Sequence, residues 1–180
     1  MWSSVMRQHG AALIRQAVLL LLVLLLAGGC AVTSTTVNDE EVVTNRKPIS
    51  SYTGIVIRDF SLSSDLGVDS AAAGLSERDK RYAMAPSVLS EHIERYVKSY
   101  RIFQSIRRND EPGPSTLVLK GAFTRIGRFR ISVTVQLIDG TDGHEVAYFR
   151  HTLWDVLDTM ESLNLLGRDV ADFVSRIQYK

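Results

Sequence analysis

The stretch Phe129-Arg130-Ile131-Ser132-Val133-Thr134-Val135-Gln136-Leu137 decides the fold class, because apolar and polar side chains alternate through it without a break. Successive side chains of a β-strand point to opposite faces, so this alternation predicts a strand with one buried and one wetted face. Residues 117–124 alternate in the same way, and Ile126-Gly127-Arg128 can turn the chain between the two stretches. The sequence therefore predicts an antiparallel pair of strands.

Further apolar stretches extend this pair into a sheet. The loop 139–143 contains Asp-Gly twice and leads into a strand over 146–153, and the β-branched stretch 52–60 predicts a first strand. Residues 102–106 are apolar without a helical period, which predicts a short strand or an extended exit. The polar segment 61–84 predicts a long loop with short helical turns, which is either a partner contact or a solvated insertion.

Two amphipathic helices complete the domain. Pro86 suits the first turn of one helix, and Asp158 with Glu161 resembles a capping box at the start of the other. Apolar residues follow each start at helical spacing, so each helix has one apolar face. These elements predict an α+β fold, a two-layer sandwich whose mostly antiparallel sheet of about four strands carries both helices on one face.

The single cysteine of the chain, Cys30, follows an apolar run over 17–27 and two glycines. Arg7 and Arg15 precede this run, and no acidic residue does. A positive start, an apolar segment and small residues have the order of a secretory signal peptide. The run is also shorter than the roughly 20 residues that a membrane-spanning helix needs.

The residues around Cys30 resemble the lipobox of bacterial lipoproteins. The resemblance implies cleavage before Cys30 and a covalent lipid on its thiol, and Ala31 in the next position implies the periplasmic face of the outer membrane. It predicts a signal peptide over 1–29, a lipidated flexible tether over 30–51 and a periplasmic domain over 52–180. The alternatives are an ordinary cleaved signal peptide with a chance cysteine, and a short membrane anchor.

The element order also resembles known periplasmic domains. A strand ending in Asp59-Phe60, the exit 103–106 and a strand pair closed by 137–143 resemble the TolB N-terminal type, the curli-secretion-channel-like lipoproteins and Gram-negative lipoprotein families of unknown function. Auxiliary lipoproteins of ABC-type lipid transporters are similar in element order but begin with a Tyr-x-Leu strand, which this chain lacks. Neither resemblance implies a catalytic residue.

Composition and motifs point away from catalysis and nucleic-acid binding. Without residues 1–29 the chain has 19 basic and 20 acidic residues, and this balance predicts no general affinity for nucleic acid. His92, His144 and His151 lack a second ligand at metal spacing, and the sequence contains no nucleophile-elbow motif. We therefore expect no enzyme activity, no metal and no cofactor besides the lipid. The alternative is a small envelope hydrolase with two facing carboxylates.

Arg125, Arg128 and Arg130 surround Gly127 at the predicted turn. Together with Arg107 and Arg108 they predict a basic patch for a phosphate or carboxylate of a lipid, glycan or partner. The alternative is a solvated hairpin whose charges discourage edge pairing.

These features together predict a lipid-anchored, non-enzymatic adaptor or assembly subunit of a periplasmic or outer-membrane complex. Its partners are the membrane, an envelope protein of unknown identity and, as a further possibility, other copies of the chain. The alternative function is a lipid- or glycan-binding accessory of an ABC-type transporter.

Overall fold

The structure is a computed structural model that describes residues 36–44, 48–66 and 74–178. The chain divides into two compact units, residues 1–33 and 34–180, and all described residues belong to the second unit. The predicted signal peptide, the lipidation site Cys30 and the middle of the 61–84 segment lie outside the described residues.

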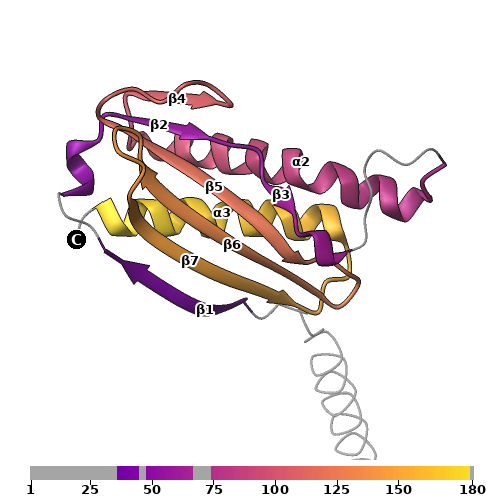
Figure 1. Ribbon diagram of the computed structural model, residues 1–180. Coiled ribbons are helices and arrows are strands. Elements are labelled where there is room, and N and C mark those ends of the chain that lie inside the picture. Colours follow the sequence, from indigo (N-terminus) through magenta and orange to yellow (C-terminus); the bar gives the residue numbers. More distant parts are fainter. Residues whose placement is uncertain (1–35, 45–47, 67–73, 179–180) are drawn as a thin grey trace, which may run out of the picture. The chain divides into compact units, whose positions relative to one another are not determined.

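The second unit is built on one mixed sheet with two helices (Figure 1). Hydrogen-bonded neighbours follow the order β1-β7-β6-β5-β2-β4, and β3 pairs with β5 beside β2. The strands are β1 (Thr36–Val43), β2 (Gly54–Ile57), β3 (Ser61–Leu62), β4 (Ser105–Arg108), β5 (Thr116–Arg125), β6 (Arg130–Asp139) and β7 (Glu145–Trp154). The helices are α2 (Glu77–Tyr100) and α3 (Thr159–Gln178), with short 3-10 turns η1 (Ile49–Ser51) and η2 (Ser64–Leu66).

The α+β class and the two helices are confirmed, but the prediction of about four mostly antiparallel strands is wrong. The sheet has seven strands, and β2 runs parallel to both β4 and β5. The physical reason is helix α2, which connects β2 to β4 and brings the chain back to the end of the sheet where β2 began. Local alternation of side chains carries no information about such a crossover.

The alternating pattern that opened the sequence forms strand β6, as predicted. Ile131, Val133, Val135 and Leu137 are fully buried, while the residues between them are half-buried on the other face. Both helices cover the buried face of the sheet and pack against each other (Figure 1). Within the described ranges, neither helix is long and apolar enough to cross a membrane.

The prediction of a flexible tether over 30–51 is wrong for residues 36–43. They form β1, which pairs antiparallel with β7 from Thr36 opposite Leu153 to Val43 opposite Ala147. An ion pair between Glu41 and Arg176 of α3 adds a side-chain contact. Pairing with β1 satisfies the main-chain hydrogen-bonding groups along the edge of β7. Because β7 lies more than 100 residues after β1, no local sequence pattern reveals this pairing.

Helix α2 begins nine residues before Pro86, where the sequence had predicted a loop. Ser76 is the N-cap residue, and its hydroxyl accepts a 3.1 Å hydrogen bond from the Asp79 N–H. The predicted strand over 52–60 is shorter than expected: β2 ends at Ile57, and β3 begins only at Ser61. Ser90 of α2 supports the break, because its hydroxyl accepts a 3.2 Å hydrogen bond from the Phe60 N–H.

Candidate functional site

The three arginines of the predicted patch lie near one hairpin tip but in different environments. Arg130 places its guanidinium carbon 4.8 Å from the centre of the Trp154 ring, a cation–π contact between β6 and the end of β7. Arg128 lies over Phe129 at 5.9 Å. Arg125 is exposed at the end of β5, opposite Ser132.

Arg107 and Arg108 do not join them, so that part of the predicted patch is wrong. Arg108 lies opposite Ile57, which pairs with Leu119, six residues before Arg125 on β5. Six residues of strand span about 20 Å. The two side chains are engaged locally: Arg107 with Asp110 at 2.6 Å, and Arg108 with Asp59 at 2.8 Å. Although burial opposes it, hydrogen bonds from Arg108 and Asn109 lower the pKa of Asp59.

Arg128 instead lines a pocket together with two arginines that sequence analysis did not assign to a site. A pocket of about 320 Å³ lies between the β5–β6 hairpin, the start of α2 and the start of α3. Arg78, Arg81 and Arg128 supply its positive charge. Its remaining lining residues are Tyr82, Leu157, Asp158, Thr159 and Met160. The signal that was missed is Ser76 with an acidic residue three positions later, which marks a helix start and places Arg78 and Arg81 on the first two turns of the helix.

A second pocket of about 410 Å³ opens on the sheet face away from the helices, at the break between β2 and β3. Lys120 and Gln136 face each other there across β5 and β6, out of phase with the buried Leu119 and Leu137. The other lining residues are Arg58, Asp59, Ser61, Gly121, Ala122 and Thr134. This mixed polar lining is typical of an open sheet face and supplies no convergent catalytic geometry.

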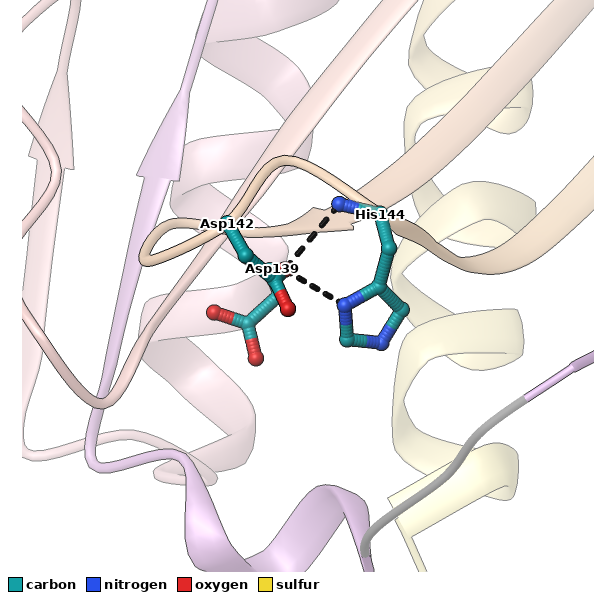
Figure 2. A group of neighbouring side chains, drawn as sticks. All are labelled: Asp139, Asp142 and His144. Carbon is teal, nitrogen blue, oxygen red and sulfur yellow. Dashed lines mark hydrogen bonds and ion pairs between the residues drawn. The ribbon is translucent and has the colours of Figure 1, made fainter.

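The loop between β6 and β7 brings Asp139, Asp142 and His144 together (Figure 2). One ligand atom of each lies within 4.8 Å of the others. Asp142 Oδ1 accepts a hydrogen bond of 3.1 Å from the His144 N–H and lies 2.5 Å from His144 Nδ1. These two contacts lower the pKa of Asp142.

The same side chains have a structural role that accounts for their positions. Asp139 is buried, accepts a 2.7 Å hydrogen bond from the Thr141 N–H and receives the Tyr52 hydroxyl at 2.8 Å. Two carboxylates and an imidazole are donors that a divalent ion can use, but three ligands are one fewer than a closed zinc site needs. The hydrogen bonds fix this turn without an ion, and the expected absence of a metal stays a prediction.

Among the described residues, His151 is a fully buried titratable side chain on the face of the sheet that packs against the helices. It is 1% exposed, stacks on Phe149 and places Nε2 3.1 Å from Asp169 Oδ2 on α3. Among the described residues, its Nδ1 has no hydrogen-bond partner. His92, on α2, has a lowered pKa because of burial and the nearby Arg95. The three histidines therefore lie on separate elements, as their sequence spacing indicated.

With this geometry in place, the fold can be compared with known proteins. No family model and no curated protein matches the chain. Among solved structures, a PelC variant dodecamer from Paraburkholderia phytofirmans has a TM-score of 0.51 and 14% identity, over 81% of this chain and 98% of that chain.

Two other solved structures are more distant. Protein XCC0632 of Xanthomonas campestris, a DUF330 protein, has a TM-score of 0.47 and 11% identity over 69% of this chain and 84% of that chain. Lipoprotein GNA1162 of Neisseria meningitidis has a TM-score of 0.29 and 15% identity over 69% of this chain and 96% of that chain. At these identities the PelC comparison shows a shared fold and nothing more. The resemblance to TolB and curli-secretion-channel-like proteins stays a prediction.

Proposed function

We propose that this chain is a lipid-anchored envelope lipoprotein whose domain is a non-enzymatic subunit of a homo-oligomeric assembly at the periplasmic face of the outer membrane. The observation that carries the proposal is the start of β1 at Thr36, only six residues after Cys30. A lipid on Cys30 would therefore be attached almost directly to a strand of the sheet.

This short connection changes the expected distance between domain and membrane. A tether of about 20 flexible residues would let the domain move over roughly 25 Å. Six flexible residues have an r.m.s. end-to-end distance of about 13 Å, and about 20 Å is their limit when fully extended. The domain would therefore be held against the bilayer in a restricted orientation, which suits a fixed component of a membrane-attached assembly.

The fold supports a homo-oligomer as the assembly. The PelC structure with this fold is a dodecamer. A ring requires two different surfaces on each subunit, one binding the other head to tail. Strands β1 and β4 form opposite edges of the sheet, and Val42 and Val43 on β1 are 38% and 42% exposed. We place one side of the subunit contact on the β1 edge.

The anchor is tested by mass spectrometry of the mature N-terminus. The expected product begins at Cys30 and carries the mass of acyl chains, and Cys30→Ala should leave the chain uncleaved. A mature chain that begins elsewhere, or an unmodified Cys30, would overturn the anchor.

The assembly is tested by native mass spectrometry of the detergent-solubilised full chain. We expect a defined multiple of the subunit mass, and Val42→Asp with Val43→Asp should reduce it to monomers. Met84→Asp, at an exposed apolar position on α2, is the matched control outside the β1 edge. A monomer at micromolar concentration in the unmodified protein would contradict the proposal.

A further inference from the structure

We propose that the pocket formed by Arg78, Arg81 and Arg128 binds the phosphate group of an anionic phospholipid. Nothing in the fold comparison assigns this site. In one respect the inference rests on the proposed anchoring, which would bring the pocket to the membrane surface. The chemistry of the pocket itself stands independently of it.

The positive charge of the pocket comes from two parts of the chain that are far apart in sequence. Arg78 and Arg81 lie on the first turns of α2, and Arg128 lies at the tip of the β5–β6 hairpin. Arg78 also contacts Asp79 at 3.2 Å. Within the part of the chain that the structure describes, Arg81 and Arg128 have no carboxylate partner. Two guanidinium groups are therefore available to a ligand.

The one carboxylate in the lining is already engaged. Asp158 accepts hydrogen bonds from the Met160 N–H at 2.7 Å and from the Glu161 N–H at 3.2 Å, and so caps α3. Its charge faces the helix backbone, where the helix dipole stabilises it. Three guanidinium groups around one capped carboxylate leave a net positive pocket. Arginine suits phosphate in particular, because its planar N–H groups bind two oxygens at once.

Apolar side chains beside the pocket indicate that the phosphate belongs to an amphiphile. Leu157, at the mouth of the pocket, is 84% exposed, and Phe129 next to Arg128 is 73% exposed. Met160 and Trp154 are 39% and 42% exposed at the same end of the sheet. Large apolar side chains rimmed by arginine are typical of membrane contact sites. A soluble phosphate would need the arginines but not these side chains.

The chain itself leads from this end of the domain toward Cys30. Thr36 pairs with Leu153, which is next to Trp154, and Trp154 pairs with Arg130. In Figure 1, β5 and β7 end, and β1, α2 and α3 begin, at the same end of the sheet. A lipid within six residues of Thr36 would therefore place the pocket and its apolar rim at the headgroup layer.

The test uses the full detergent-solubilised chain and native mass spectrometry of bound lipid. Short-chain phosphatidylglycerol is the anionic probe, phosphatidylcholine of the same chain length is the zwitterionic probe, and sodium phosphate is the soluble probe. The test variant is Arg81→Gln with Arg128→Gln. The matched control is Arg101→Gln with Arg107→Gln, which removes the same charge at the end of α2 and on β4, away from the pocket. All four positions are exposed, so circular dichroism should show an unchanged fold.

The unmodified protein should retain phosphatidylglycerol in preference to phosphatidylcholine. The test variant should bind phosphatidylglycerol at least about tenfold more weakly, and the control variant should bind like the unmodified protein. Equal retention of the two lipids, or equal loss in both variants, would overturn the inference. Binding of sodium phosphate alone would overturn the lipid as its source.

The same spectra report whether Cys30 is acylated, so the two proposals fail separately. An acylated chain without lipid preference overturns only the pocket. A chain without acylation that still selects phosphatidylglycerol overturns only the anchor.

Discussion

The hydroxyl of Tyr52 donates a 2.8 Å hydrogen bond to Oδ2 of Asp139, and both side chains are 2% exposed. The two residues lie 87 positions apart and join the segment before β2 to the end of β6. Burial and the neighbouring Asp139 raise the pKa of Tyr52, so the phenol stays neutral and remains a donor. This bond fixes the loop that holds Asp139, Asp142 and His144.

Tyr52→Phe should destabilise the domain, because it removes a donor from a buried carboxylate. We expect the free energy of unfolding to fall by about 1–3 kcal/mol. Urea denaturation followed by circular dichroism measures the change. Tyr148→Phe is the matched control, since Tyr148 is half-buried on the open sheet face, and it should change stability by less than about 0.5 kcal/mol. Equal effects of the two substitutions would show that the hydrogen bond from Tyr52 to Asp139 contributes no measurable stability of its own.

Gly167→Ala should push helices α2 and α3 apart. A Cβ at this position would lie 2.6 Å from His92 Cβ and 3.2 Å from the His92 carbonyl carbon. Such overpacking costs about 1–3 kcal/mol, more than the helix propensity that alanine gains. Thermal unfolding should show a lower midpoint for this variant. Gly127→Ala, whose new Cβ would find its nearest atom at 3.9 Å, should melt close to the unmodified protein.

The predictable parts of the fold were those with local causes. The alternation over 129–137 and the cap at Asp158 depend on neighbouring residues, so β6 and the start of α3 were predicted closely. β1 was missed because its stability comes from β7, more than 100 residues away. The arginine pocket was predicted only through Arg128, since Arg78 and Arg81 reach it by a helix start that was assigned to a loop.

Tyr100 should make the domain sensitive to alkaline pH. Its hydroxyl donates a 2.5 Å hydrogen bond to Asp172 on α3, and burial followed by this bond raises its pKa to about 12 from 10.0. A pKa that is higher in the folded state contributes stability below the unfolded pKa, and this contribution disappears as the pH rises through the folded pKa. The unmodified protein should therefore lose its stability advantage over Tyr100→Phe between about pH 10 and pH 12.

Urea midpoints of the two proteins at pH 8, 10 and 11 measure this difference. All other ionisable side chains are the same in both proteins, so their contributions cancel in the comparison. A stability difference that stays constant over this range would contradict the assigned pKa.

Asp169→Ala should destabilise the domain by about 1–3 kcal/mol, because it removes the acceptor beside the buried Nε2 of His151. Asp169→Asn keeps a side-chain oxygen at this position and should recover most of the loss. Urea denaturation distinguishes the two variants. If alanine and asparagine have the same effect, the contact contributes only packing.

Residues 40–43 should be protected from amide hydrogen exchange if they are part of the sheet. Their partners on β7 run from Arg150 to Ala147. The hairpin loop 127–129 between β5 and β6, which lies outside both strands, provides a fast-exchanging reference within the same molecule. Exchange at 40–43 as fast as in this loop would restore the flexible tether in place of β1.

The pairing of β1 with β7 has a consequence for the order in which the domain can form. β1 precedes the rest of the sheet, yet among the described strands it pairs only with β7, the last strand before α3. Because the chain is synthesised from its N-terminus, almost the whole domain must be made before β1 can pair with β7. Contacts so distant in sequence also form slowly. Once β7 has formed, its edge is free to pair with another chain until β1 joins it. The docking of β1 is therefore the folding step before which the domain is most exposed to aggregation. A chaperone would be of most use at this step.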